Sequence, residues 1–372
     1  MRASLIFLLF LLLVGCTEPT EPRFQIEASF YLVEGKIADV EGSSEVNVRR
    51  SDFGSLQLEF ESVPDADVVA VNGAGARVQW QLVDSVAGKY QPPADFAGRT
   101  GEAWFLEVNT ADGTSIYSDP ETVPPPVALT DFEIVFDQEA SYDVGRERFI
   151  PAFKLLVDFQ DPADRTDYYQ WDYAYWEKID VCASCYGGQV WREGSCREVG
   201  SGSRYVQRYD YYCDALGGCY RQTVGNEFQY GQDEFFAGQA VVDRPIGQIE
   251  FIDYGGLLVE AVQYTITQEA YAYGKVISDL LTGSSGLNAT IPATLDGNVR
   301  NADPEGVQVL GYVGTAGVSS MRRFITRSET TGTPLPADRQ IRPEPSVGAF
   351  IPPRAYCSGD GKTPEKPRGW PE

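Results

Sequence analysis

The stretch WFLEVNTADGTSIY, residues 104–117, shows most clearly how this chain folds. Apolar side chains recur at every second position from Trp104 to Val108, which is the pattern of a strand with one buried and one solvated face. Asp112-Gly113 follows, and these residue types tolerate the positive φ that tight hairpin turns require. Ser115–Tyr117 then reads as the returning strand. The segment therefore predicts an antiparallel β-hairpin.

Similar short apolar segments, separated by turn residues, extend over residues 24–123. About seven such strands in ~100 residues favour an immunoglobulin-like or transthyretin-like β-sandwich. In one of the segments we expect Leu56, Leu58 and Phe60 to face the core, because they alternate with polar residues. The other expected strands are Phe24–Ala28, Phe30–Val33 and Val78–Val83.

A proline-rich stretch marks the boundary of a second domain. Pro124, Pro125 and Pro126 stiffen the chain, so we assign residues 124–130 to a linker and residues 131–372 to a larger β-rich domain. One helix is expected there from Thr267 to Leu281, because its apolar residues recur on one face. Thr265 or Thr267 is expected to cap its first turn, and Gly283 stands where helices commonly end. The predicted fold class is mainly β with one short helix.

The N-terminus has the pattern of a lipoprotein signal peptide, residues 1–15. Arg2 is followed by the apolar run Leu5–Leu13, too short for a membrane span of ~20 residues. Leu13-Val14-Gly15-Cys16 resembles a bacterial lipobox, in which the cysteine receives diacylglyceryl and acyl (palmitate) chains. We therefore expect lipidation of Cys16 and a lipidated tether over residues 16–23. The alternative is an ordinary signal peptide with an incidental cysteine.

Composition excludes several classes of function. The formal net charge is −24, with 54 acidic and 30 basic residues, which argues against binding to nucleic acid or to anionic lipid. The chain has no histidine, so Ser-His-Asp catalysis, Cys-His catalysis and histidine-ligated zinc are excluded. Carboxylate-pair hydrolysis and calcium binding remain open. We expect no catalytic residues, and no cofactor other than the covalent lipid.

Six cysteines besides Cys16 fit an oxidising compartment. An even number in an exported chain suggests three disulfide bonds, whose connectivity the spacing leaves open. Five of them fall within residues 182–219, which we interpret as an insertion stapled by disulfides. A four-cysteine zinc site is the alternative, but the wide spacing of the later cysteines disfavours it. The disulfide candidates are Cys182, Cys185, Cys196, Cys213, Cys219 and Cys357.

Two groups of residues stand out as sites. Tyr169, Trp171, Tyr173 and Tyr175 would share one face of a strand, which suits either an aromatic binding face or packing within the protein, and packing is the preferred interpretation. Two oxygen-rich segments resemble loops that hold cations, but solvated turns are preferred, because Asp and Asn bond to their own backbone there, and no metal is expected. These segments contain Asp158, Asp161, Asp164 and Asp167, and then Asp296, Asn298, Asn301 and Asp303.

The order of several motifs resembles a family of Bacteroidota outer-membrane lipoproteins, domain of unknown function 4249. The matching segments are Leu32-Val33-Glu34-Gly35, Val46-x-Val48-x-Arg50-Ser51, Gly88-x-Tyr90, Asp112-Gly113, Asp161-Pro162, Tyr168–Trp171, Gly297–Pro304, Val309–Tyr312 and a tail with Cys357, Gly361, Pro367 and Trp370. The family tail usually has a second cysteine close to the first, which this chain lacks. Cys357 is therefore expected to bond within the 182–219 insertion or to stay free.

The resemblance implies an outer-membrane lipoprotein, often encoded near TonB-dependent transporters. We expect a surface-facing, non-enzymatic accessory that captures substrate for such a transporter, with no nucleic-acid partner. A periplasm-facing orientation remains open. A structural or adhesive surface lipoprotein is the alternative, and a carboxylate-based hydrolase is the second alternative, which requires two buried carboxylates in one cleft.

Overall fold

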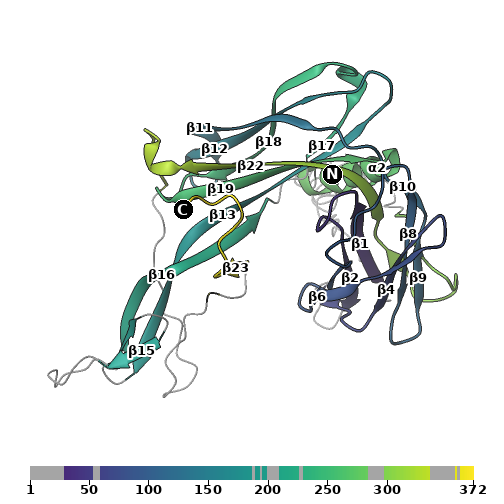
Figure 1. The fold of residues 1–372 in the computed structure, drawn as a ribbon, viewed down its shortest axis with the longest axis horizontal. Helices are drawn as coiled ribbons and strands as arrows, with labels where there is room; N and C mark the ends of the chain where they lie inside the picture. The colour runs from purple at the N-terminus through teal and green to yellow at the C-terminus, as the bar shows by residue number, and fades with distance from the viewer. Residues whose placement is uncertain are drawn as a thin grey trace, which may run out of the picture.

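The protein consists of two β-rich bodies that meet at an angle (Figure 1). The computed structural model describes residues 29–52, 59–186, 189–192, 195–198, 209–225, 229–283, 297–335, 357 and 361–372. Strands dominate these residues, which confirms the mainly-β prediction. The helical elements described are α2 (Gln268–Gly283) and two single-turn 3-10 helices, η1 (Asp233–Phe235) and η2 (Arg327–Glu329).

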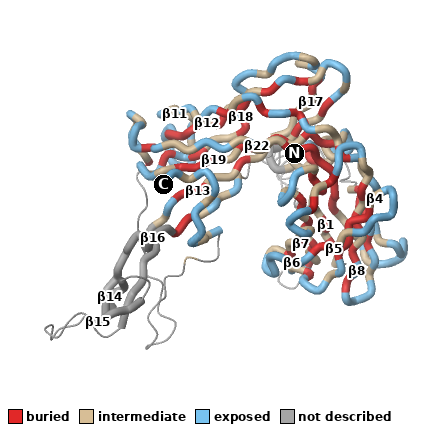
Figure 2. Tube along the Cα trace, in the orientation of Figure 1, coloured by how far each residue is buried: buried red, intermediate tan, exposed pale blue. Residues whose placement is uncertain are grey.

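The first body is a sandwich of two sheets with one apolar core. Val33 and Val48 from one sheet and Leu106 from the other lie in the same core cluster, with no measurable exposure. Figure 2 shows buried residues running along the faces where the layers meet. One layer contains β1 (Tyr31–Ala38), β2 (Glu45–Asp52), β3 (Glu59–Ser62), β6 (Gln81–Asp84) and β7 (Lys89–Gln91). The other contains β4 (Asp67–Asn72), β5 (Arg77–Gln79), β8 (Ala103–Asn109), β9 (Ser115–Ser118), β10 (Glu121–Thr122) and β20 (Val299–Asn301).

The hairpin predicted over residues 104–117 is present as β8 and β9. Val108 pairs with Ile116 across the ladder, and Gly113 has φ 90° at the turn. The Asp112 carboxylate accepts a hydrogen bond from the Thr114 amide at 3.1 Å, as expected of aspartate in tight turns.

Two of the expected strands differ from the structure. Phe60 is 39% exposed in β3, so the prediction that it faces the core is wrong. Its ring packs edge-on against the ring of Phe30, with 6.0 Å between the ring centroids. Leu56, Leu58 and the segment Phe24–Ala28 lie outside the described residues. The expected strand Val78–Val83 is two strands, because Trp80 enters the core at the point where the chain passes from one sheet to the other.

The second body stacks a three-stranded sheet on long strands of a larger sheet. Phe153, Phe159 and Phe251 from the smaller-sheet side pack with Trp171 and Val259 of the larger sheet in one buried cluster. The smaller sheet contains β11 (Leu129–Asp143), β12 (Arg148–Gln160) and β18 (Ala240–Glu250). The larger one contains β13 (Tyr168–Tyr186), β16 (Tyr209–Val224), β17 (Gln229–Gln232), β19 (Gly256–Ile266), β22 (Val313–Thr326) and β23 (Lys362–Thr363).

A single twelve-stranded sheet passes through both bodies. Its strand order is β23-β16-β13-β19-β22-β1-β2-β7-β6, and the step between the bodies is the parallel pair of β22 and β1. The register places Gly35 opposite Val313 and Ala38 opposite Ala316. β21 (Val309–Leu310) also pairs with β1, and β20 pairs with β9. Strands from residues 131–372, the predicted second domain, thus pair with strands from residues 24–123, the predicted first domain.

Glycine permits the close approach of chains at this junction. Gly311 has φ +119°, and a Cβ there would lie 2.1 Å from the carbonyl oxygen of Val33. A Cβ on Gly297 would lie 1.7 Å from the carbonyl oxygen of Gly311. Any larger side chain at either position would separate the returning segment from β1.

The proline linker is fastened to the second body. The Val127 amide donates to Thr265 Oγ1 at 3.1 Å, and Gln263 Nε2 donates to the Val127 carbonyl oxygen at 2.8 Å. Both side chains are buried. Arg165 also donates to the Pro125 carbonyl oxygen at 3.3 Å. The linker is therefore a packed part of the structure, held by these hydrogen bonds besides the stiffness of its prolines.

The predicted insertion forms an arm that extends away from both bodies (Figure 1). β13 and β16 pair from Ala174 and Val224 out to Tyr186 and Tyr209, and β14 (Gln189–Arg192) pairs with β15 (Ser195–Glu198). The register places Cys182 opposite Cys213. The side chains of Cys182, Cys185, Cys196 and Cys213 lie outside the described residues, so bonds between them remain predictions.

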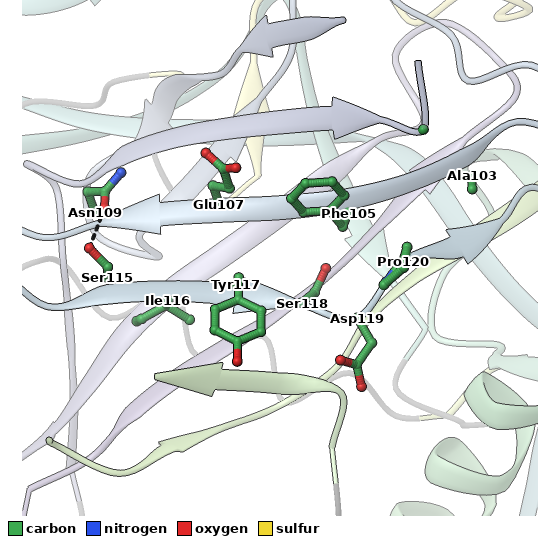
Figure 3. Close-up of a pocket in the computed structure, with 11 residues that line it drawn as sticks. Ala103, Phe105, Glu107, Asn109, Ser115, Ile116, Tyr117, Ser118, Asp119 and Pro120 are labelled. Carbon is green, nitrogen blue, oxygen red and sulfur yellow. Dashed lines mark hydrogen bonds between the residues drawn. The ribbon is translucent and has the colours of Figure 1, made fainter. Parts of the chain in front are cut away.

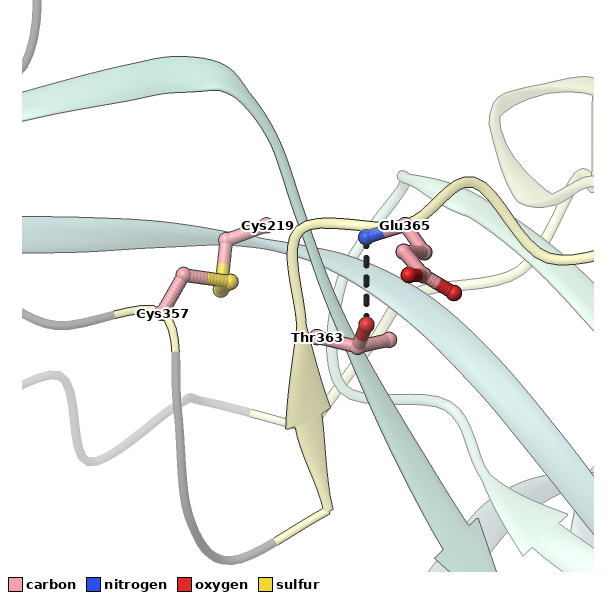
Figure 4. The surroundings of a disulfide bond; sticks show 4 residues. All are labelled: Cys219, Cys357, Thr363 and Glu365. Carbon is pink, nitrogen blue, oxygen red and sulfur yellow. Dashed lines mark hydrogen bonds between the residues drawn. A yellow bond between two sulfur atoms is a disulfide. The ribbon is translucent and has the colours of Figure 1, made fainter.

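The C-terminal tail is bound to the base of this arm. Cys219 forms a disulfide with Cys357, so of the two outcomes left open by the sequence the tail bonds to the insertion (Figure 4). β23 pairs with β16 directly beside this bond. Further along, Trp370 packs edge-on against Tyr220 at 5.0 Å and against Phe324 at 5.1 Å. The tail is thus held by a covalent bond, a short ladder and one aromatic anchor.

Replacing both cysteines of this bond with alanine is expected to lower the free energy of unfolding by about 2–5 kcal/mol, because a long loop closed by a disulfide restricts the unfolded chain. Guanidinium denaturation of the unreduced protein measures the loss. Cys357→Ala alone is the control and should lose the same amount, since the bond is absent either way. Equal stability of variant and wild type would contradict a structural role for the bond.

Candidate functional site

Helix α2 lies where the two bodies meet (Figure 1). Thr267 caps it: Thr267 Oγ1 accepts a hydrogen bond from the Ala270 amide at 3.1 Å, as the sequence predicted. Two cavities flank the helix, and Tyr273 and Tyr312 line both of them. The rings of these two tyrosines stack at 4.9 Å between centroids, with 28° between their planes. The stacked pair therefore forms the wall between the cavities.

The smaller cavity has a volume of about 320 Å³, and we call it the Lys36 cavity. It is built from both bodies, because β1 and β2 come from the sandwich and the remaining elements come from the second body. Its lining residues include Glu34, Lys36, Asn47, Gln170, Tyr230, Ile266, Ala270, Tyr273, Ile277 and Thr315. Ligand sites commonly lie at such junctions between domains.

The charged groups of this cavity all have partners. Lys36 Nζ lies 3.6 Å from a carboxylate oxygen of Asp172 and 3.5 Å from the centroid of the Tyr264 ring. Burial alone would lower the pKa of Lys36, but Tyr264 and Asp172 outweigh it and the pKa is raised, so the ammonium group stays charged. Glu34 pairs with Arg49 at 2.7 Å. The lining of the Lys36 cavity is therefore polar, but each of its charged groups is already paired with an opposite charge.

Two tyrosine hydroxyls belong to the same cavity. Burial, together with the negative charge of Asp172, raises the pKa of Tyr230 to about 12. Gly274 allows this ring to lie against the helix, because a Cβ there would lie 2.3 Å from it. Burial and then Glu34 raise the pKa of Tyr273, whose hydroxyl is buried without a hydrogen-bond partner among the residues described. A buried hydroxyl without a partner is costly, so a molecule that reached it would gain a hydrogen bond.

The larger cavity has a volume of about 740 Å³ and contains Glu121. This carboxylate accepts hydrogen bonds from the Tyr312 hydroxyl, from Thr267 Oγ1 at 3.1 Å and from the Thr315 amide at 3.0 Å. Burial is the main cause of its raised pKa. These bonds connect β10, the start of α2 and β22, so the principal role of Glu121 is to fasten the two bodies together.

The carboxylates of this cavity do not meet the condition for hydrolysis by a pair of acids. Besides Glu121, its lining includes Asp119, which is partly exposed, and Glu269, which is exposed. Asp119 also pairs with Arg300 at 2.6 Å. A carboxylate pair would need both groups held close together in a protected cleft. Neither Asp119 nor Glu269 is buried.

A third hollow lies on the outer face of the sandwich, where β8 changes partner from β9 to β10 (Figure 3). Its volume is about 680 Å³. Phe105, Tyr117 and Pro120 give it a mainly apolar floor, and Glu107 at its rim pairs with Arg77 at 2.6 Å. We call it the outer groove.

The aromatic residues singled out from sequence are in the core, which corrects the hypothesis of a binding face. Tyr169, Trp171 and Tyr173 are at most 5% exposed, and Tyr175 is half-buried beside them. Trp171 Nε1 donates to Gln263 Oε1 at 2.8 Å, and the Tyr173 hydroxyl donates to the Gln248 carbonyl oxygen at 3.0 Å. The three-stranded sheet covers this face, so the packing interpretation holds.

The first oxygen-rich segment is a turn, but it is less solvated than expected. Asp161 and Asp167 are buried, and the Tyr169 hydroxyl donates to Asp161. Arg165 pairs with Asp167 at 2.8 Å, and the Asp158 carboxylate accepts a hydrogen bond from the Asp243 amide at 2.8 Å. These carboxylates hold the loop in place.

The second oxygen-rich segment fixes the returning chain. The buried Asn298 side chain exchanges two hydrogen bonds of 2.9 Å with the backbone of Val313, and Asn301 donates to the Val307 carbonyl oxygen at 2.8 Å. Asp296 lies outside the described residues. In the part of the chain that the structure describes, no three Cys, Asp or Glu side chains are grouped to hold a metal ion.

Sequence reasoning missed the residues that form the two cavities. Lys36, Glu121, Tyr273 and Tyr312 come from four distant segments, and none belongs to a motif with known chemistry. Gly274 within a helical pattern was the available signal, since glycine inside a helix often marks a close approach. Cys16 lies outside the described residues, so its predicted lipidation stays a prediction.

The fold and the site define a class: a histidine-free, mainly-β protein of two bodies with a cavity at their junction. Residues 17–322 match the family described as "Domain of unknown function (DUF4249)", and the chain belongs to this family. No curated protein shows significant similarity to the chain. No helix among the residues that the structure describes is long and apolar enough to cross a membrane.

Glu121→Ala is expected to lower the free energy of unfolding by about 2–4 kcal/mol, because three part-buried donors lose their acceptor. Glu121→Gln should lose less, since the amide oxygen still accepts and the Tyr312 hydroxyl can rotate to accept from the amide nitrogen. Denaturant unfolding of both variants measures the difference, and similar losses for Ala and Gln would contradict the fastening role.

The comparison of Glu121→Gln with the wild type also predicts how stability depends on pH. A raised pKa in the folded state means that wild-type stability falls as the pH rises from the ordinary carboxylate pKa through the raised value. Glu121→Gln lacks this titration. Its deficit relative to wild type should therefore be larger at pH 4 than at pH 7.5, and a deficit that grows with pH would contradict the direction of the shift.

Proposed function

We propose that this protein is a surface-facing outer-membrane lipoprotein of the Bacteroidota type, anchored through lipid on Cys16. The observation that carries the proposal is the sequence Leu13-Val14-Gly15-Cys16 after a short apolar run. Several acyl chains on one residue give firm anchoring, since each buried CH₂ contributes about 0.8 kcal/mol. The acidic, proline-containing segment after Cys16 suits a spacer that holds the folded part away from the lipid.

We infer that the anchored protein is a non-enzymatic accessory that captures substrate for a TonB-dependent transporter. Three features support this role: the Lys36 cavity at the junction, the arm formed by β13 and β16, and the lack of histidine. The cavity suits capture of a small molecule, and an arm that reaches beyond the two bodies suits contact with a large neighbouring protein. The sheltered Glu121 is used for fastening rather than for acid catalysis.

The alternative is a structural or adhesive surface lipoprotein without a transporter. The outer groove is the observation in its favour, because a mainly apolar hollow on an exposed sheet face suits contact with another protein. The two functions differ in their partner, which the following experiment identifies.

Crosslinking of intact cells, solubilisation in mild detergent and affinity purification of the full chain test both parts of the proposal. We expect mass spectrometry to find an acylated Cys16 as the mature N-terminus and a large β-barrel transporter crosslinked to the protein. Cys16→Ala is the control and should leave the membrane fraction. An unacylated mature N-terminus would contradict the anchor, and recovery without any barrel protein would contradict the accessory role.

A further inference from the structure

We propose that the Lys36 cavity binds a neutral, polyhydroxylated molecule of monosaccharide size. The inference rests on the proposed capture role, because it names the class of ligand that the protein would capture. The size of the cavity, the balance of its charges and the arrangement of its polar and apolar groups support this class of ligand.

The volume limits the ligand to a small molecule. The cavity measures about 320 Å³. At ~30 Å³ for a group of the size of water, this corresponds to about ten such groups, which is of the order of a hexose. The glycines and the helix that bound it leave little room to expand, because Gly274 already lies against the Tyr230 ring.

The charge balance favours a neutral ligand. Lys36 is shared between Asp172 and the face of Tyr264, and Glu34 is paired with Arg49. Gln170 Nε2 also donates to both carboxylate oxygens of Asp172 at 3.1 Å. A charged ligand would lose its hydration without meeting a counter-charge that is not already engaged, which is costly in a buried site.

The remaining groups suit a molecule with a polar edge and an apolar face. The Tyr273 hydroxyl has no partner among the described residues, and the amides of Asn47 and Gln170 lie in the same lining. The Tyr230 ring and the side chains of Ile266 and Ile277 supply apolar surface. A sugar ring presents hydroxyl groups at its edge and C–H groups on its faces. It would therefore contact both the polar and the apolar residues of the lining.

The position of the cavity between the two bodies predicts that a ligand stabilises the whole protein. Because Lys36 comes from the sandwich and Tyr273 from α2, a ligand between them contacts both bodies at once. Binding is therefore expected to raise the unfolding temperature of the whole protein, as any ligand specific for the folded state does.

Isothermal titration of the full mature protein in detergent tests the proposal, with D-glucose, D-galactose and D-mannose as neutral probes and gluconate and glucosamine as charged ones. We expect saturable binding of at least one neutral hexose and weaker binding of its charged counterpart. Tyr273→Phe should weaken binding about 3- to 10-fold, which is the effect of one hydrogen bond. Failure of all three hexoses to bind, or preference for a charged probe, would overturn the proposal.

Two helix variants show which cavity is occupied. Ala270 lines the Lys36 cavity, whereas Ala272 lines the larger cavity beside Glu121. Ala270→Leu is expected to abolish hexose binding with its unfolding temperature retained, and Ala272→Leu should bind within twofold of wild type. The opposite result would place the ligand elsewhere. Crosslinking to a barrel protein needs no sugar, so failed hexose binding with intact crosslinking overturns this inference and leaves the proposed function standing.

Discussion

The parallel pairing of β22 with β1 joins the two bodies of the protein. Gly35 donates its amide to the Tyr312 carbonyl oxygen at 3.0 Å, and Asp39 donates its amide to Ala316 at 3.1 Å. Through this pair one sheet continues from the sandwich into the second body. The two bodies therefore cannot separate without breaking backbone hydrogen bonds, and the cavities beside α2 exist because the bodies are held at this junction.

Polar side chains reinforce the same junction. Glu121 joins the sandwich to α2 and β22, and Asn298 exchanges hydrogen bonds with Val313. Away from the junction, the buried Arg327 is shared between Glu177 at 2.6 Å and Asp253. Such buried polar groups specify one arrangement, because a different packing would leave them without partners. The same specificity positions the tyrosines that line the proposed binding cavity.

Local signals in the sequence predicted the elements well, but not their assembly. The hairpin of β8 and β9 was predicted because its alternation and its Asp112-Gly113 turn are local, and helix α2 because its period and its Thr267 cap are local. The parallel step was not predictable, because it pairs Gly35 with Val313, which lie near opposite ends of the chain. For the same reason the sequence could only favour packing over a binding face for the aromatic strand, while the cavity was found only in the structure.

Hydrogen exchange of the native protein tests whether the pairing of β22 with β1 fixes the two bodies to each other. We expect the amides of Gly35 and Asp39 to exchange as slowly as the amide of Val48 in the core of the sandwich, and both bodies to unfold in one cooperative transition in denaturant. Junction amides that exchange orders of magnitude faster than Val48, with separate unfolding transitions for the two bodies, would contradict it.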